Sequence, residues 1–431
     1  MRVLLANYRY FISGGPERYM FNVIDGLIAR GHEIIPFSIN YARNKTTPYA
    51  RYFVEPLGSP DEVTFREQNW KPGTVWRTLQ RLFYARDVEG AVTDLVMQTR
   101  PQVAYVLHYL RKLSPSLLVG LKRAGLPIVV RLSDYAMLCP QAHCLRDGHP
   151  CQLCVQGNLW PSIRYRCVQQ SWIVSFLNAL ATWYHRFRRY FDLIDVFIVT
   201  NRFMYQMMAF AGFPEHRLRL IPTFVDGAVF KPNPMLAKDS SVIYAGRLET
   251  IKGVHVLIES LALLRQRRPD LNLRAKVAGT GNKHYSASLY QMAQQSGLAD
   301  RVEFLGEIGT LELSELLSRS IVSVVPSLWY ENLPNAILES YACGTPVLAS
   351  DIGSLPECVK NGETGFLFPA GDSESLGRLL EYCMDHSLQM EQMGRKARHV
   401  AETMYSPQTH LDALEGLFKE LLERADAPNE F

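Results

Sequence analysis

Two glutamates near the middle of the second half have the type and spacing to bind a ligand. Glu331 and Glu339 lie in the segment 326–351, just before and just inside an expected helix. Carboxylates accept hydrogen bonds from paired hydroxyl groups, as on a sugar or a ribose. The backbone N–H groups of Asn332 and Leu333, at the start of that helix, favour an anion. The segment predicts a phosphate pocket flanked by two carboxylates; the alternative is a solvated helix start with acidic residues beside its dipole.

A second segment supplies two cations after a strand. Arg247 follows a strand that ends in Gly246, and Lys252 comes five residues later, at a helix start. A guanidinium can bind a diphosphate bidentately, while an ammonium acts as a point charge. The alternative is a surface loop with ordinary charges. Opposite a helix start that already favours anions, diphosphate binding is the favoured interpretation.

A glycine pair precedes the first expected helix. Gly14 and Gly15 lack side chains, which permits a close approach of the backbone to a ligand. The pair is no dinucleotide-binding fingerprint, because no third glycine follows at the required spacing, and it is no Walker loop, because Gly-Lys-Ser/Thr is absent. By itself it predicts a close backbone approach and nothing more specific.

Alternating strands and helices must position these loops. Apolar runs predict strands in the first half at 2–7, 33–37, 103–107, 128–132 and 196–199, and in the second half at 242–245, 274–278, 302–305, 321–325, 347–349 and 365–368. Helices are expected in the second half at 254–267, 285–296, 311–318 and 334–342, with Gly344 as a left-handed end of the last. Such alternation predicts two open α/β domains of Rossmann type, whose ligands bind at the carboxyl ends of the strands. The proline-rich stretch 221–234 is the expected boundary, and 408–424 is an amphipathic helix.

Composition fits a folded chain of this size. The 431 residues suit two domains, and 47% apolar with 20% charged residues excludes a disordered or low-complexity protein. No apolar run approaches the length of a membrane-spanning helix, and the short apolar run at the start does not resemble a signal peptide, so we expect a cytoplasmic protein. Residues 1–225 carry 27 Lys and Arg against 15 Asp and Glu, whereas residues 226–431 carry 19 against 27. The basic first half could face anionic lipid, a phosphorylated substrate or nucleic acid.

Five of the eight cysteines fall within 29 residues. Four of them include a Cys-x2-Cys pair and would suit tetrahedral Zn²⁺, namely Cys139, Cys151, Cys154 and Cys167. Cys144, His143 and His149 are alternative ligands. The other interpretation is a set of free, buried thiols, and an iron–sulfur cluster is less favoured than zinc. In either case the expected role is to fold a loop.

Aromatic and basic residues interleave in two stretches, 70–86 and 172–190. At helical spacing this pattern suits an interface with anionic lipid, while the alternative is a pair of helices packed on their own domain. The charge of the whole half favours peripheral membrane contact. A nucleic-acid partner is not expected, because no recognised binding motif accompanies the charge.

Taken together, the motifs resemble family 4 of the retaining glycosyltransferases. The resemblance covers nearly the whole chain and is strongest over 240–400. It is carried by Glu331-x7-Glu339 after Pro-Ser-Leu, Gly246-Arg247-x4-Lys252-Gly253, Ala278-Gly279-Thr280-Gly281, and Gly14-Gly15-Pro16-Glu17 followed by Arg30-Gly31-His32-Glu33. The resemblance implies the GT-B fold, with an acceptor domain (1–225), a nucleotide-sugar domain (226–405) and a last helix (406–431) that crosses back to the first domain. A subset of the family has a similar cysteine-rich insertion.

The resemblance also implies roles for the site residues. Glu339 would hold the donor ribose and Glu331 sugar hydroxyls. The diphosphate would be held by the N–H groups at Asn332 and Leu333 together with Arg247 and Lys252. The loop with Gly14 and Gly15 would close over it. The implied reaction is metal-independent, retaining transfer of a hexosyl group from a nucleotide-diphosphate sugar to a glycan or lipid-linked acceptor. The expected setting is bacterial cell-surface polysaccharide synthesis, at the inner face of the membrane.

One position departs from the family pattern. Ser133 stands where many relatives carry a histidine, and Asp134 follows it. The catalytic candidates are therefore Glu331, Asp134 and Ser133. His108 lies at the end of another strand, and a structural role is its favoured interpretation. A serine there leaves open a non-catalytic nucleotide-sugar-binding scaffold. A nucleotide-sugar epimerase on the same fold is a further alternative, which would need an acid/base set in the cleft that the sequence does not identify. The complete sets Glu331/Glu339 and Arg247/Lys252 argue against the scaffold.

Overall fold

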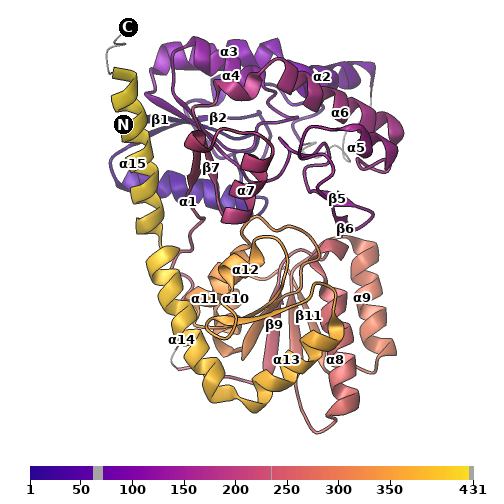
Figure 1. Ribbon diagram of the computed structural model, residues 1–431. Helices are drawn as coiled ribbons and strands as arrows, with labels where there is room; N and C mark the ends of the chain where they lie inside the picture. Colours follow the sequence, from indigo (N-terminus) through magenta and orange to yellow (C-terminus); the bar gives the residue numbers. More distant parts are fainter. Residues whose placement is uncertain (62–70, 234, 427–431) are drawn as a thin grey trace.

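The computed structural model describes residues 1–61, 71–233 and 235–426. They form two α/β domains, one above the other in Figure 1, each built around a six-stranded parallel sheet. A separate hairpin of β5 (Leu145–Arg146) and β6 (His149–Pro150) lies in the cysteine-rich segment. Among the helices of these residues, none combines the length and apolarity needed to cross a membrane.

The first sheet consists of β1 (Arg2–Ala6), β2 (Glu33–Phe37), β3 (Val103–Val106), β4 (Ile128–Arg131), β7 (Val196–Val199) and β8 (Leu218–Leu220). Its order is β2-β1-β3-β4-β7-β8. The strands β3, β4 and β7 are buried along their whole length, as strands covered on both faces must be. One face packs against α3 (Arg86–Thr99), α4 (Ser116–Arg123) and α7 (Arg202–Phe210), and the other against α1 (Gly15–Ala29) and α15 (Pro407–Asp426).

Three further helices, α2 (Pro72–Phe83), α5 (Trp160–Arg164) and α6 (Trp172–Phe187), lie together at one end of this domain (Figure 1). Both stretches with interleaved aromatic and basic residues are thus helical. Trp70, which opens the first stretch, lies outside the described residues, as does Pro234 of the proline-rich stretch.

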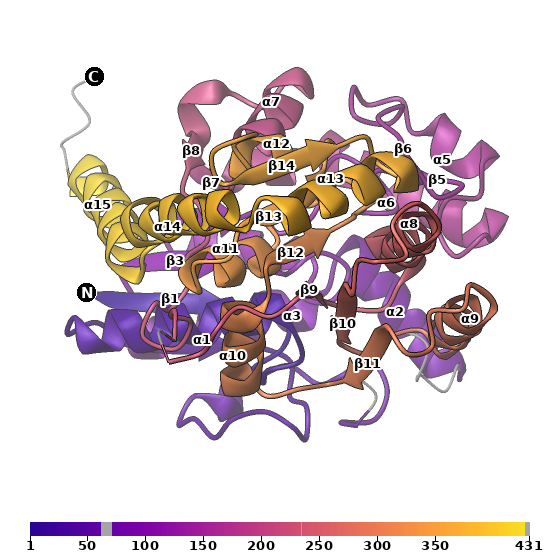
Figure 2. The same ribbon diagram turned by 90° about the horizontal axis from the view of Figure 1, so that it is seen from below.

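The second sheet consists of β9 (Ser241–Ala245), β10 (Arg274–Ala278), β11 (Val302–Gly306), β12 (Val322–Val325), β13 (Val347–Ser350) and β14 (Gly365–Phe368). Its order, β11-β10-β9-β12-β13-β14, reverses between β9 and β12, which is the switch point where doubly wound sheets bind ligands. On one face lie α8 (Val254–Arg267), α9 (Lys283–Gln295) and α13 (Ser373–Asp385). On the other lie α10 (Thr310–Arg319), α11 (Asn335–Ala342), α12 (Leu355–Cys358) and α14 (Ser387–Met404), and Figure 2 separates α8 and α9 from α10 and α11.

The last two helices run past both domains. In Figure 1, α14 lies beside the second domain and α15 beside the first. Leu414 and Phe418 of α15 are buried in the first domain, where the Phe418 ring lies 5.8 Å from that of Tyr105 on β3. Arg30, at the end of α1, donates to Asp412 at 2.7 Å. The crossing helix is therefore part of the core of the first domain.

The predicted elements of the second half recur within one or two residues. Helix α9 begins two residues early, because Asn282 caps it by accepting from the Tyr285 N–H at 3.1 Å. Helix α11 begins at Asn335, so Pro334 stands before the first helical residue and not within it. Gly344 has φ +69° just beyond α11, the left-handed conformation expected there. Strand β8 and the β5–β6 hairpin were not predicted, because runs of two or three residues carry no periodic signal.

Candidate functional site

The carboxyl ends of the two sheets meet at the side chain of Asn332, in the loop after β12. Its Nδ2 donates to the carbonyl oxygen of Leu132, after β4, at 2.9 Å. Its Oδ1 accepts from Thr200 Oγ1 at 2.5 Å and from Asn201 Nδ2 at 3.0 Å, after β7. Loops that follow strands of both domains therefore form one hydrogen-bonded junction.

Lys252 and Glu331 form a mostly buried ion pair at the switch point of the second sheet. Lys252 Nζ lies 2.6 Å from Glu331 Oε1, which also accepts from Ser327 Oγ at 2.6 Å. The two loops are joined as well by Leu328 N–H, which donates to Ile251 O at 2.8 Å. Burial acts to raise the pKa of Glu331, but Lys252 and Ser327 outweigh it and lower that pKa. The carboxylate is therefore held in its charged form.

Glu339 lies in the first turns of α11, with 7% of its surface exposed. Arg18 of α1, in the other domain, places Nη1 3.3 Å from Glu339 Oε1. Burial raises the pKa of Glu339 and the charge of Arg18 opposes that shift. The sequence reasoning missed Arg18; the available signal was a basic residue in the first turn after the Gly14–Gly15 pair.

The glycine loop of the first domain approaches α11 closely. A Cβ atom on Gly15 would lie 3.1 Å from Asn335 Nδ2, whereas Gly14 is extended, with φ 177°. Within the described residues, the backbone N–H groups of Asn332 and Leu333 form no hydrogen bond with another group. The glycine loop thus lies against Asn335, the first residue of α11, and the predicted anion-binding N–H groups come just before that residue in the chain.

Arg247 is the most exposed of the predicted donor-binding residues. Its guanidinium pairs with Glu249 at 3.0 Å, and 65% of its side chain is exposed. It also lies near the imidazole of His143, whose pKa is lowered chiefly by burial and to a smaller extent by the Arg247 charge. Arg247 and Lys252 therefore differ in their state: the first is exposed beside the domain junction, and the second is engaged with Glu331.

On the side of the first domain, Ser133 and Asp134 follow β4. Ser133 Oγ accepts from Arg131 Nη1 at 2.7 Å, while Asp134 accepts from the Ala136 N–H at 2.8 Å. Burial lowers the pKa of His108, after β3, and the negative charge of Asp134 opposes this. Asp134 and His108 are thus neighbours, whereas Ser133 is bound to Arg131, the last residue of the preceding strand.

The cysteine-rich segment reaches the junction through two side chains. The His143 ring lies 5.4 Å from the Trp329 ring, and Gln152 Nε2 lies 3.1 Å from Tyr330 Oη. Burial lowers the pKa of His143 and Asp134 opposes this. His143 therefore belongs to the domain junction. Its side chain does not line the cavity that the five clustered cysteines share.

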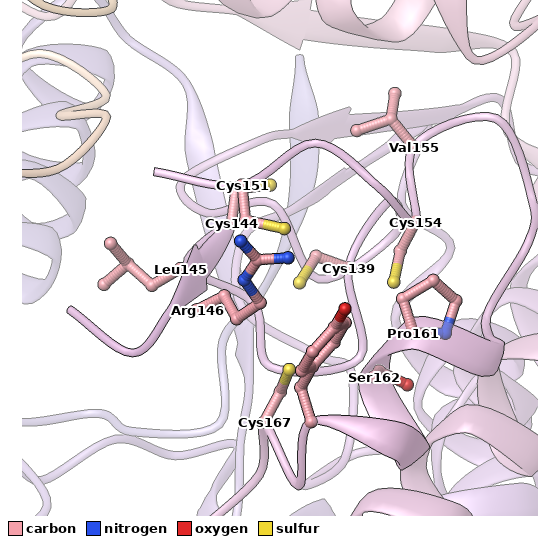
Figure 3. Close-up of a pocket in the computed structure, with 11 residues that line it drawn as sticks. Cys139, Cys144, Leu145, Arg146, Cys151, Cys154, Val155, Pro161, Ser162 and Cys167 are labelled. Carbon is pink, nitrogen blue, oxygen red and sulfur yellow. The ribbon is translucent and has the colours of Figure 1, made fainter. Parts of the chain in front are cut away.

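All five clustered cysteines line one small cavity, drawn in Figure 3 with their sulfur atoms directed toward the same space as the Arg146 guanidinium. Cys144 is among them and only 1% exposed, so the sequence-based choice of four cysteines omitted a buried neighbour. His149 does not line the cavity. As the side chains stand, the described residues contain no group of three or more Cys, His, Asp or Glu arranged to hold a metal ion.

The sequence of the second domain matches a known family model. Residues 228–400 match the family model described as "Glycosyl transferases group 1". A D-inositol 3-phosphate glycosyltransferase of Paenarthrobacter aurescens is 30% identical over 207 residues, which is 46% of this chain and 50% of the relative. One from Pseudarthrobacter chlorophenolicus is 32% identical over 203 residues, 44% of this chain and 48% of the relative. The chain thus spans about half the length of the curated relatives it matches.

Solved structures match the whole chain. Anabaena Alr3699/HepE in complex with UDP has a TM-score of 0.68 at 18% identity, covering 97% of this chain and 100% of that one. A sucrose-phosphate synthase from Thermosynechococcus elongatus has a TM-score of 0.72 at 18% identity, covering 98% and 99%. The chain accordingly has the GT-B fold of glycosyltransferases, with a match to glycosyl transferases group 1 over residues 228–400.

Proposed function

We propose that this chain is a retaining glycosyltransferase of family 4. It transfers a sugar from a nucleoside diphosphate sugar to a glycan or lipid-linked acceptor on the cytoplasmic face of a bacterial membrane, in cell-surface polysaccharide synthesis. The observation that carries the proposal is the Lys252–Glu331 pair at the switch point of the second sheet, with Glu339 on the adjoining helix. The match of residues 228–400 and the UDP bound by a structure of the same fold support it.

The donor would bind across the start of α11. Glu339 accepts hydrogen bonds from the ribose hydroxyls, and Glu331 from hydroxyls of the sugar. The free N–H groups of Asn332 and Leu333 face the diphosphate. For this to occur Arg18 must move away from Glu339, so donor binding replaces an ion pair between the domains by ribose contacts.

The bond between the anomeric carbon and the diphosphate oxygen then breaks. Arg247, Lys252 and the helix start stabilise the negative charge that develops on that oxygen, so this proposal needs no metal for catalysis. The acceptor hydroxyl oxygen bonds to the same face of the anomeric carbon, and its proton passes to the departing phosphate oxygen. The anomeric configuration is retained. A product of inverted configuration, read by NMR, would contradict this mechanism.

Asp134 and His108 are the side chains of the first domain best placed to contact the acceptor or the transferred sugar. Burial favours neutral His108, which can accept or donate a hydrogen bond to a hydroxyl. Ser133, already bound to Arg131, is the weakest of the catalytic candidates. Replacing Ser133 by Ala is therefore expected to change turnover less than replacing Asp134 by Asn.

Titration calorimetry with UDP-, GDP-, ADP- and CMP-sugars tests the donor site. Wild type should bind one donor class, and Glu339→Ala should bind it at least about tenfold more weakly, as expected for loss of a charged hydrogen-bond acceptor. Glu374→Ala, which removes an exposed carboxylate of α13 paired with Arg378, is the matched control and should bind as wild type does. Failure of wild type to bind any donor would overturn the proposal.

A binding protein without catalysis is the alternative that the same experiment addresses. The scaffold would be favoured if wild type binds a donor that Glu339→Ala does not bind, but wild type neither transfers the sugar to acceptors in a lipid extract nor slowly hydrolyses the donor. Conversion of the bound sugar to its epimer, seen by NMR, would favour the epimerase.

We further propose that the cysteine cavity holds a structural Zn²⁺ through Cys139, Cys151, Cys154 and Cys167. Four thiolates fit the tetrahedral preference of zinc, and all four line one cavity. Binding requires side-chain rotation, because the thiols as they stand form no metal-binding group. Elemental analysis should give one zinc per chain, lost in Cys151→Ser/Cys154→Ser and kept in Cys343→Ala, a buried cysteine of the other domain. Zinc-free wild type would contradict this proposal.

A further inference from the structure

Helix α6 exposes its large apolar side chains and buries its small ones. Five residues at spacings of three and four form one stripe, each at least 37% exposed, namely Trp172, Phe176, Leu180, Trp183 and Phe187. This stripe is called the aromatic stripe below. The residues of α6 that face the domain are Ser175, Ala179, Ala181, Thr182 and His185. A helix that packed its aromatic face on its own domain would show the reverse arrangement.

The stripe is ordered by its own contacts. The rings of Trp172 and Phe176 stack at 5.8 Å with an interplanar angle of 10°, and those of Trp183 and Phe187 stack at 5.2 Å with 11°. Trp172 is 55% exposed and Phe187 68%. Monomeric proteins rarely leave a contiguous apolar face of this kind uncovered, and such faces mark interaction sites.

The stretch of chain that contains the stripe has charges of one sign. No Asp or Glu occurs from 148 to 191, a segment that contains five arginines. Four of them are exposed: Arg164 at the end of α5, Arg166 two residues later, and Arg188 and Arg189 just after α6. Arg189 pairs with Asp192, the first acidic residue after the segment, so three exposed arginines remain without an acidic partner among the ion pairs of the described residues.

Helix α2 packs beside α6 and also exposes a tryptophan. His185 of α6 bonds to Leu82 O at 2.9 Å, and the Tyr184 ring lies 5.8 Å from that of Phe83, so the two helices pack side by side, as Figure 1 also shows. Trp76 of α2 is 63% exposed. No acidic residue occurs from 71 to 86, and Arg77 is exposed.

We propose that the aromatic stripe and the exposed arginines beside it dock this protein on an anionic lipid bilayer. Tryptophan and phenylalanine side chains enter the boundary between headgroups and acyl chains, while arginines bind the anionic headgroups above it. The helix lies in the plane of the membrane, with its small-residue face toward the domain. Charge complementarity selects lipid over a second copy of this chain, because two copies would bring arginine rims of like charge together.

Vesicle flotation tests the proposal. Wild type should bind vesicles of phosphatidylcholine with phosphatidylglycerol, bind those of phosphatidylcholine alone more weakly, and be released by salt. Trp172→Ser/Trp183→Ser should lower binding by about tenfold or more, the scale of two large aromatic side chains that no longer enter the interface. Arg164→Glu/Arg188→Glu should remove the preference for phosphatidylglycerol.

The matched control is Leu311→Ser, because Leu311 is 73% exposed but lies on α10 of the other domain. It should bind vesicles as wild type does. Equal thermal melting of all variants excludes misfolding as the cause of any loss. Wild type that binds neither vesicle type, or a tryptophan variant that binds fully, would overturn the proposal. A wild-type dimer that the tryptophan variant converts to a monomer, without vesicle binding, would assign the stripe to self-association.

This inference goes beyond the proposed function and does not depend on it. Glu339→Ala should bind vesicles as wild type does even where it no longer binds a donor. The tryptophan variant should bind the nucleotide sugar normally in solution. Loss of membrane binding and loss of donor binding are thus separate results.

Discussion

Arg18 and Glu339 are 321 residues apart and form an ion pair between the two domains, with Nη1 and Oε1 3.3 Å apart. The pair occupies the carboxylate that we propose for the donor ribose. Donor binding and domain contact therefore compete for one side chain, and the protonation of Glu339 should govern both.

The first prediction concerns pH. Burial raises the pKa of Glu339 and Arg18 opposes that shift. The ionised carboxylate is the better acceptor for hydroxyls, so donor affinity should fall as pH drops through this pKa. Arg18→Ala removes the opposing charge, raises the pKa further and should move the midpoint of this loss to higher pH, as titration calorimetry at several pH values would show. Arg378→Ala, on exposed α13, should leave the midpoint in place; a midpoint that moves down in Arg18→Ala would contradict the assignment.

Lys252→Met should destabilise the protein strongly. Glu331 is 5% exposed and would lose its partner, and breaking a buried pair on one side costs about 3–5 kcal/mol. Adding Glu331→Gln should restore much of this, because it removes the buried charge. Urea unfolding measures both. Removing one partner of the exposed Arg378–Glu374 pair should cost under about 1 kcal/mol. If Lys252→Met alone were as stable as wild type, the ion pair with Lys252 would not stabilise Glu331.

Asn332→Ala should loosen the junction between the domains. The change removes the side-chain hydrogen bonds to Leu132, Thr200 and Asn201, whereas the bond from Asn201 Nδ2 to the Asn332 carbonyl oxygen remains. The radius of gyration from small-angle scattering should rise. Asn282→Ala also removes a hydrogen-bonding amide, the cap of α9, but at a distance from the junction. It should lower stability slightly and leave the radius unchanged. An unchanged radius in Asn332→Ala would show that other contacts hold the domains together.

Gly15→Val should weaken donor binding without unfolding the chain. A Cβ there already lies 3.1 Å from Asn335, and the two methyl groups of valine would push the glycine loop away from α11. We expect the KM for the donor to rise about tenfold, the effect of a misplaced binding loop. At Gly309 an added Cβ has no atom within 4 Å, so Gly309→Val is the control and should keep its KM. An unaltered KM in Gly15→Val would mean that this loop does not close over the donor.

Local sequence was sufficient for the elements and for the loops that carry the candidate site. Short apolar runs between helical patterns place β9, β10 and β12, because strand and helix periods are properties of neighbouring residues. Those predicted elements also gave the positions of Glu331, Glu339 and Lys252 relative to strands and helices. The exposed aromatic stripe was also visible as a pattern, but whether it faced the domain or the solvent was not.

What only the tertiary structure decided is which side chains meet. Lys252 forms an ion pair with Glu331, and Arg18 forms one with Glu339. Asn332 forms hydrogen bonds with residues that follow β4 and β7, and the ring of His143 contacts that of Trp329. Each of these contacts joins residues at least 79 positions apart. The periodicity of a chain fixes its strands and helices, whereas the partners of side chains that are far apart in sequence depend on how the finished elements and the two domains pack together, and no local pattern records that.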